Sequence, residues 1–310
     1  MELLELKGLK VTFPTEAGPV RAVDSVDLKL KAKEKLGLIG ETGSGKSVLA
    51  HAILRLLQSD ALSEGEILYR GKNLVGLEKK ELRRLRGREL ALIPQNPSRS
   101  LNPLKKVGKQ LSETLRQAGY SRKEAAVRVP ELLFAVGASE PVSWAEAYPH
   151  ECSGGMCERI VIAMALAFSP ALLLADEPTK GLDSRNKARI LALLKSLTKE
   201  RALLFITHDL EAAAQICTRL AFMYAGELVE LGARTKVLEH PLHPYTQGLL
   251  RACPKGGLHP IPGRSPPLFA LPKGCRFQAR CALAIERCRN EPPPFFDTGA
   301  GHFCRCWLCA

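Results

Sequence analysis

The stretch KLGLIGETGSGKSVLAHAILRLL, residues 35–57, decides the fold class. It opens with a short apolar run at 36–39 and continues through a glycine-rich segment that ends in Lys46-Ser47. Apolar residues at helical spacing follow as far as Leu57. The middle fits the pattern G-x-x-x-x-G-K-[ST], which marks a phosphate-binding loop when it lies between a strand and a helix. We therefore predict a strand, a phosphate loop and a helix reaching Leu57 within an α/β fold.

The chemistry of this segment predicts a site for ATP and Mg²⁺. Glycines let backbone N–H groups close around phosphate oxygens. Lys46 neutralises charge on the β and γ oxygens, and Ser47 is a ligand for Mg²⁺. The predicted nucleotide-binding residues here are Gly40, Glu41, Thr42, Gly43, Ser44, Gly45, Lys46 and Ser47.

A second segment, ALLLADEPTKGLD at 171–183, places two acids after an apolar run. The run is typical of a buried parallel strand, whose carboxyl end is where such sheets bind ligands. We predict that Asp176 helps to hold Mg²⁺ and that Glu177 polarises the attacking water as general base. An acidic pair that merely ends a strand is the structural alternative.

Gln95 and His208 also follow short apolar runs, LALIPQ and ALLFIT. A glutamine after a strand is often only a polar loop residue, and a lone histidine is usually structural. Several strands that end in phosphate-relevant residues favour function, because their carboxyl ends share one edge of a parallel sheet. We predict that Gln95 senses Mg²⁺ and water and that His208 contacts the γ-phosphate.

The stretch ECSGGMCERI, 151–160, is a second glycine-rich helix start. Its serine and two glycines offer a hydroxyl, backbone N–H groups and the positive end of a helix. It has no lysine of its own. Glycine-rich helix starts of this kind often bind phosphate.

Taken in order, these segments resemble an ABC ATPase over residues 1 to about 240. The resemblance implies a RecA-like core with an antiparallel β subdomain and a helical subdomain at about 96–155. It also implies that two ATPase subunits pair head to tail. ATP then lies between the phosphate loop of one subunit and Ser153, Gly154 and Gly155 of the other.

The same resemblance implies two further roles and shows one departure. Asp183 belongs to a loop that communicates across the dimer, and Phe13 stacks on adenine. Cys152, Cys157 and Glu158 stand where the relatives have leucine, arginine and glutamine. This change shifts charge at the helix start from positive toward negative, so we expect weaker catalysis at the composite site.

The composition limits the possible functional classes of the protein less than the motifs do. The chain has 310 residues, ten cysteines and a net charge of +13. Such a charge suits nucleic acid, an anionic membrane face or anionic substrates. We find no secretory signal and no membrane span, so we expect a soluble, cytoplasmic chain whose cysteines are reduced thiols or metal ligands. The basic run EKKELRRLRGRE is expected to be a solvated surface helix.

The composition changes after residue 240, where we predict an extension at 241–310 with a proline-rich linker and a cysteine cluster. HPYTQGLL, IPGRSPPLFALPKGCRF and CRCWL resemble the C-terminal extension of oligopeptide, dipeptide and nickel importer ATPases. The resemblance implies a four-iron four-sulfur cluster held by Cys275, Cys281, Cys288 and Cys306. A zinc site or free thiols are the alternatives, and Cys304 and Cys309 are extra.

The resemblance thus implies the MgATP-hydrolysing subunit of an importer of di- and oligopeptides, peripheral on the cytoplasmic face of the membrane. The implied partners are two membrane permeases, a second ATPase subunit that forms a heterodimer and, indirectly, an extracytoplasmic solute-binding protein. Nickel or a metal chelate is the alternative solute. A non-transport ABC ATPase acting on nucleic acid and a regulatory subunit with little hydrolysis are the competing classes, and we expect no nucleic-acid partner.

Overall fold

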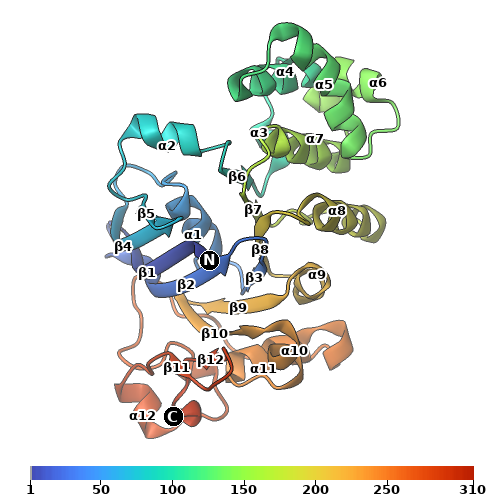
Figure 1. Cartoon of the computed structure of the whole chain (residues 1–310). Helices are drawn as coiled ribbons and strands as arrows, with labels where there is room; N and C mark the ends of the chain where they lie inside the picture. The colour runs from blue at the N-terminus through green and yellow to red at the C-terminus, as the bar shows by residue number, and fades with distance from the viewer. Residues whose placement is uncertain (1) are drawn as a thin grey trace. The chain divides into compact units, whose positions relative to one another are not determined.

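A computed structural model describes residues 2–310 of the chain (Figure 1). The chain divides into two compact units. The first contains the residues up to Leu77 together with Phe205–Ala310, and the second contains Glu78–Leu204. None of the described helices is long and apolar enough to cross a membrane.

The first unit contains an antiparallel sheet in the order β2-β1-β4-β5. Its strands are β1 (Glu2–Phe13), β2 (Val20–Lys31), β4 (Leu62–Tyr69) and β5 (Lys72–Asn73). Alternate residues of β2, such as Val26, Leu28 and Leu30, are buried because successive side chains of a strand point to opposite faces. The predicted β-rich segments at about 3–13, 20–31 and 64–70 are confirmed.

A second set of strands in this unit carries the phosphate loop. Strand β3 (Lys35–Ile39) runs parallel to β9 (Arg219–Tyr224), which is antiparallel to β10 (Glu227–Ala233). The short strands β12 (Phe303–Cys304) and β11 (Phe296–Asp297) continue from β10. The helices of this unit are α1 (Lys46–Ile53), α9 (Leu210–Ile216), α10 (Arg234–Glu239), α11 (Pro244–Ala252) and α12 (Glu286–Asn290). Strand β8 (Ala202–Thr207) crosses the boundary between the units.

Helix α1 is shorter than predicted. It ends at Ile53, and Leu56 and Leu57 lie beyond it. Arg55 takes a left-handed conformation with φ of 50°. From there its Nη1 donates to the carbonyl oxygens of Leu74 at 3.0 Å and Leu77 at 2.7 Å. These two hydrogen bonds favour the turn over a further helical turn.

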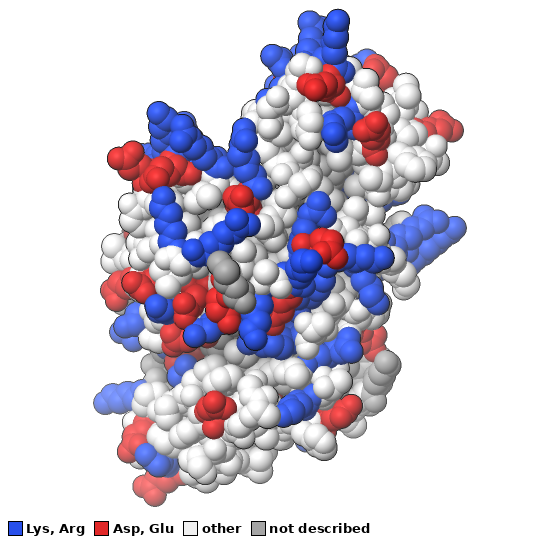
Figure 2. Space-filling view, viewed as in Figure 1, with Lys and Arg blue, Asp and Glu red and all other residues white. Residues whose placement is uncertain are grey.

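The second unit is mainly helical. Strands β6 (Leu90–Ile93) and β7 (Leu172–Asp176) are parallel, with Ile93 opposite Ala175. The helices are α2 (Lys79–Leu85), α3 (Pro97–Ser100), α4 (Val107–Ala118), α5 (Arg122–Ala135), α6 (Pro141–Glu146), α7 (Gly154–Leu166) and α8 (Ser184–Leu197). Helix α2 is the predicted surface helix, since Leu82 is buried while its basic residues are exposed or half-buried. On the face shown in Figure 2, basic residues are interspersed with acidic ones.

The proline-rich segment of the first unit has little regular structure. Within the described residues 254–277, the only regular element is the 3₁₀ turn Pro254–Gly256. The segment is nevertheless held against the β strands, because the backbone N–H of Arg21 donates to the Leu268 carbonyl at 3.2 Å.

Candidate nucleotide-binding site

The phosphate loop contains three glycines that differ in how strictly their surroundings require glycine. Gly45, the residue before α1, has φ of 103°, and a Cβ there would lie 2.1 Å from the Ala22 carbonyl oxygen. A Cβ on Gly40 would lie 2.2 Å from the Met223 carbonyl oxygen. Gly43 has φ of 83° and faces open space. Positive φ and close backbone approach both require glycine, so the loop can curve tightly against β9.

Lys46 lies inside this curve. Its Nζ donates to the carbonyl oxygens of Gly40 at 2.7 Å and Glu41 at 2.8 Å, and to Ser44 Oγ at 3.3 Å. The side chain is buried, whereas Ser47 on the first turn of α1 is half-buried. The ammonium is therefore positioned where the loop would enclose a phosphate group.

The loop is fastened at Glu41 by residues from near the C-terminus. Arg280 Nη1 donates to Glu41 Oε2 at 2.8 Å, and Nη2 donates to Oε1 at 2.9 Å. Ser265 Oγ donates to Oε2 at 2.9 Å, and the Glu41 N–H donates to Tyr245 Oη at 2.9 Å. Burial alone would raise the pKa of Glu41, but the hydrogen bonds from Arg280 and Ser265 outweigh it and lower that pKa. We call Tyr245, Ser265 and Arg280 the loop clamp.

Aromatic packing fixes the clamp arginine. Arg280 ends a 3₁₀ turn, Gln278–Arg280, and its guanidinium lies 5.7 Å from the ring centre of Tyr224 and 5.8 Å from that of Phe277. Its Nε donates to the Pro262 carbonyl at 2.9 Å. Sequence reasoning missed the clamp, because Arg280 and Glu41 are 239 positions apart and no spacing rule connects them.

Gln95 and the predicted acids leave the sheet of the second unit at one edge. Ile93 of β6 lies opposite Ala175 of β7, and Gln95 and Glu177 are each two residues further on. Because the strands are parallel, both side chains emerge at their shared carboxyl edge. Glu177 is a non-glycine residue with φ of 53°, a conformation that clusters at functional sites. Asp176 and Glu177 are both buried.

The Ser-Gly-Gly helix start adjoins Asp183 within the same unit. Ser153 caps α7, its Oγ accepting from the Met156 N–H at 3.3 Å. A Cβ on Gly155 would lie 3.4 Å from Asn186 Cγ. Asn186 in turn donates its N–H to Asp183 Oδ1 at 2.9 Å, and these bonds lower the pKa of Asp183. The structure therefore brings together two segments that sequence reasoning treated separately.

Two other predicted residues lie on the first unit. Phe13 is the last residue of β1, half-buried and opposite Val20. His208 follows β8 directly and is exposed. Both are accessible to a ligand from solvent. Their predicted contacts with adenine and with the γ-phosphate stay predictions.

Known proteins match the chain over nearly its whole length. The sequence profile of the family described as ABC transporter matches residues 23–180, and that described as oligopeptide/dipeptide transporter, C-terminal region, matches 229–288. The oligopeptide transport ATP-binding protein OppD of Bacillus subtilis is 44% identical over 99% of this chain and 88% of that protein. This chain belongs to the ABC transporter family.

Further relatives agree. OppD of Haemophilus influenzae is 42% identical over 99% of this chain and 98% of its own length, and OppD of Salmonella typhimurium is 44% identical over 94% and 89%. A solved dimeric ATP-binding cassette, MJ0796, bound to ADP and Pi, is similar in fold with a TM-score of 0.67 and 28% identity. It covers 74% of this chain and 98% of its own. The chain has the fold of an ABC ATPase, a family that couples ATP hydrolysis to transport.

Two of the three unusual residues at this ABC ATPase's helix start are buried, and Cys152 is half-buried. Cys157 is 1% exposed, and its Sγ donates to the Pro149 carbonyl at 3.7 Å. Glu158 is 4% exposed, and within the described residues its Oε1 has no hydrogen-bond partner. Burial raises the pKa of Glu158 to about 8, so the carboxyl is mostly neutral at pH 7. Burial therefore opposes the expected shift toward negative charge at this helix start, and the expected weakening of catalysis stays a prediction.

The four cysteines singled out in the extension gather in the first unit. The Cys275 N–H donates to the Cys288 carbonyl at 2.8 Å. Burial raises the pKa of the Cys275 thiol to about 12, and the neighbouring thiols Cys288, Cys306 and Cys281 add to the rise. Within residues 2–310, however, no group of three or more His, Cys, Asp or Glu side chains is arranged to hold a metal ion.

The two extra cysteines pair with each other. Cys309 Sγ lies 2.9 Å from Cys304 Sγ, and Cys304 is fully buried. Hydrogen bonds with Cys304 and Cys309 also lower the pKa of the Cys306 thiol, so the two extra cysteines adjoin one of the four predicted ligands.

Proposed function

We propose that this chain is the MgATP-hydrolysing subunit of an importer that takes up di- and oligopeptides through partner permeases. The observation that carries the proposal is the joint presence of a built phosphate loop around Lys46 and a tail that matches the oligopeptide/dipeptide transporter C-terminal region. Three relatives with that whole-chain similarity are named as oligopeptide transport ATP-binding proteins.

The roles follow from the chemistry of each group. Lys46 and the loop N–H groups bind the β and γ phosphates, and Ser47, Asp176 and Gln95 supply oxygen ligands for Mg²⁺ or its waters. Glu177 orients and activates the attacking water as general base. Mg²⁺ neutralises the charge that develops on the phosphate oxygens.

Five further residues complete the proposed nucleotide site. His208 contacts the γ-phosphate, and Phe13 stacks on adenine. Ser153 offers its hydroxyl, and Gly154 and Gly155 offer N–H groups at the start of α7, to the nucleotide held by a partner ATPase. Gly154 suits this role, since it is exposed and a Cβ there would meet nothing within 4 Å.

The partners proposed are two membrane permeases, a second ATPase subunit and an extracytoplasmic solute-binding protein that acts through the permeases. A peripheral position on the cytoplasmic face of the membrane follows from those partners. The replacement of the usual residues at Cys152, Cys157 and Glu158 favours pairing with a different ATPase subunit, because two copies would place this altered helix start in both composite sites. Head-to-tail pairing lets ATP hold the dimer closed and hydrolysis release it.

The cysteine cluster is proposed to hold a four-iron four-sulfur cluster on Cys275, Cys281, Cys288 and Cys306. Residues 2–310 contain no group of three or more side chains arranged to hold a metal ion, so the proposal rests on the resemblance of the tail, and a four-thiolate zinc site is the alternative. A four-iron cluster binds each thiolate to a different iron, so it needs the thiols gathered but not around one ion. Anaerobically purified protein is expected to show broad visible absorption with iron and labile sulfide. Colourless protein with one zinc per chain would contradict the proposal.

The function is tested by capture of the tagged chain from gently solubilised membranes and mass spectrometry of its partners. Two permeases, a sister ATPase and a solute-binding protein are expected. The captured complex, rebuilt in vesicles, should then hydrolyse ATP faster when peptide-loaded binding protein is added, and a Glu177→Gln complex should not. Stimulation by nickel-loaded but not peptide-loaded binding protein would reassign the solute. Recovery of nucleic acid without permeases would refute transport.

A further inference from the structure

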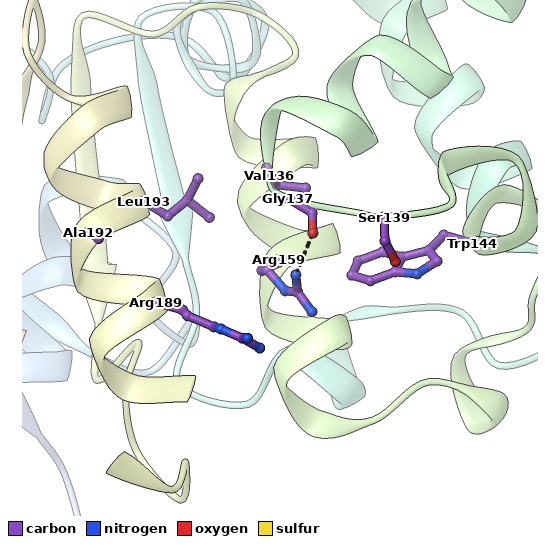
Figure 3. A pocket seen from close by; sticks show the side chains of 8 residues that line it. All are labelled: Val136, Gly137, Ser139, Trp144, Arg159, Arg189, Ala192 and Leu193. Atoms are coloured by element: carbon purple, nitrogen blue, oxygen red, sulfur yellow. Dashed lines mark hydrogen bonds between the residues drawn. The ribbon is translucent and has the colours of Figure 1, made fainter. Parts of the chain in front are cut away.

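The helical unit contains a cavity that no part of the nucleotide site uses. Its volume is about 600 Å³, large enough for a small organic molecule. Residues from the end of α5, from α6, α7 and α8 line it: Val136, Gly137, Ser139, Trp144, Arg159, Arg189, Ala192 and Leu193. Figure 3 shows the two arginine side chains lying between α8 on one side and Trp144 on the other.

Arg159 is held rigidly at the wall of this cavity. Its Nε donates to the Gly155 carbonyl at 3.1 Å, and its Nη1 donates to the Gly137 carbonyl at 2.8 Å. The guanidinium lies 4.5 Å from the ring centre of Trp144, a cation–π distance. A guanidinium has five N–H donors, and these bonds use only two of them. The remaining donors are available on the side of the cavity.

Arg189 reaches the same space from α8. It is exposed, and it makes no hydrogen bond or ion pair with any described part of the chain. Figure 3 shows its guanidinium directed toward that of Arg159. Burial lowers the pKa of Arg159, and the neighbouring positive charge of Arg189 lowers it further.

No acidic side chain is among the described residues that line the cavity beside this pair. The lining residues other than the two arginines are uncharged. Like charges held together without a carboxylate repel, and the repulsion is relieved when an anion binds between them. Two guanidiniums match a dianion better than a single carboxylate, which neutralises only one of them.

We propose that this cavity binds a small phosphate monoester, with the phosphate between Arg159 and Arg189 and the organic part against Val136, Ala192 and Leu193. A phosphate monoester carries a charge of about −1.5 to −2 at pH 7 and three acceptor oxygens, which suits two guanidiniums. The apolar side chains account for the part of the cavity that a bare phosphate ion leaves unfilled. Ser139 offers a hydroxyl at the rim.

Phenyl phosphate is a suitable probe, because it joins a phosphate monoester to a compact apolar group. Its binding to the full-length chain is measured by titration calorimetry at fixed ionic strength, with the phosphate loop saturated by Mg²⁺ and a non-hydrolysable ATP analogue. Inorganic phosphate and benzoate are titrated in parallel. Inorganic phosphate lacks the apolar group, and benzoate lacks the second negative charge. Phenyl phosphate is expected to bind at least about fivefold more tightly than either.

Arg189→Gln removes one guanidinium at an exposed helix position, so the fold is expected to persist. The affinity for phenyl phosphate should fall about tenfold or more, the range expected for lost charge-assisted hydrogen bonds. Arg185→Gln is the matched control, since Arg185 is an exposed arginine on the same helix that does not line the cavity. It should leave the affinity unchanged.

Three results would overturn the proposal. They are no binding of phenyl phosphate at millimolar concentration, equal weakening by Arg189→Gln and Arg185→Gln, and equal affinities for phenyl phosphate and benzoate. If inorganic phosphate binds as tightly as phenyl phosphate, the ester assignment is wrong and the site is one for free phosphate. None of these results bears on ATP hydrolysis or peptide transport.

Discussion

Replacement of Arg280 by glutamine is expected to weaken ATP binding while leaving the chemical step almost unchanged. Arg280 does not belong to the phosphate loop, but it holds the side chain of Glu41, the second residue of that loop. Glu41 also supplies a carbonyl oxygen to Lys46 Nζ at 2.8 Å. Loss of the guanidinium frees the loop at this point and leaves a carboxylate without its cation, hydrogen-bonded by Ser265, beside the place where phosphates bind.

The size of the effect follows from the exposure of the two partners. The Arg280 side chain is 5% exposed and that of Glu41 is 30% exposed, so the pair lies between the surface and buried limits. Exposed pairs contribute about 0–1 kcal/mol, and breaking a buried pair costs about 3–5 kcal/mol. We take about 2 kcal/mol for the loss. Tyr245 still holds the Glu41 N–H, so roughly 1.4 kcal/mol of it should reach ATP binding, which is a tenfold rise in KM.

Steady-state ATPase kinetics of the assembled transporter separate KM from kcat. Arg280→Gln should raise the KM for ATP about tenfold and change kcat less than about twofold, and Arg280→Lys should recover part of the loss. Arg289→Gln, on exposed α12, is the matched control. In a cycle with Glu41→Gln, the double variant should be less impaired than the sum of the single variants. Additive effects, or a KM no higher than that of Arg289→Gln, would refute the clamp.

Other predictions concern burial and backbone strain. Burial raises the Glu158 pKa to about 8, so the folded chain holds a proton that the unfolded chain releases, and stability is lost as pH rises from about 4.5 to 8. Glu158→Gln should remove about 4 kcal/mol of this loss of stability, measured as the free energy of unfolding in urea at pH 5 and at pH 8. The same dependence of unfolding free energy on pH in the native chain and the variant would contradict this prediction. The weaker catalysis expected from the sequence suggests that Cys157→Arg would restore activity. We expect it instead to lower stability by roughly 3 kcal/mol and to reduce the ATPase rate, because Cys157 is 1% exposed. A variant with a higher ATPase rate and unchanged stability would contradict this prediction. Gly45→Ala should abolish detectable nucleotide binding by calorimetry, because its Cβ would lie 2.1 Å from a backbone oxygen, whereas Gly43→Ala meets open space and should retain weak binding.

The parts of the fold that depend on neighbouring residues were predictable. The phosphate loop, its strand and the start of its helix follow from residues close in sequence, and the alternation in β2 follows from period two. The end of α1 was not predictable in this way. Leu56 and Leu57 continue the helical spacing, but Arg55 turns left-handed to bind carbonyl groups about twenty positions away.

The parts of the site that depend on distant contacts were not predictable. In the sequence, Glu41 occupies a variable position of the phosphate-loop pattern. No residue near it in sequence indicates that it pairs with Arg280. From the sequence, Glu158 is expected to be a charged residue on a helix. Its burial depends on how the whole unit packs and so could not be predicted from its neighbours. The gathering of Asp183 with Gly155 likewise depends on Asn186, a residue with no signal of its own.

In the extension, three cysteines are each next in sequence to an arginine that contacts the strands or the phosphate loop of the nucleotide-binding unit. Arg276 follows Cys275, Arg280 precedes Cys281 and Arg305 precedes Cys306. Each arginine contacts the strands or the phosphate loop. Arg276 pairs with Asp24 and Glu227, Arg280 pairs with Glu41, and Arg305 donates to the Leu228 carbonyl.

Neighbouring residues cannot move independently over such short distances. Whatever holds the three thiols in place therefore also restrains the three guanidiniums, and one of these fixes the phosphate loop. On this basis the proposed cluster acts on ATP binding through Arg280, so its removal should raise the KM for ATP in the native chain and should have much less effect once Arg280 has been replaced by glutamine.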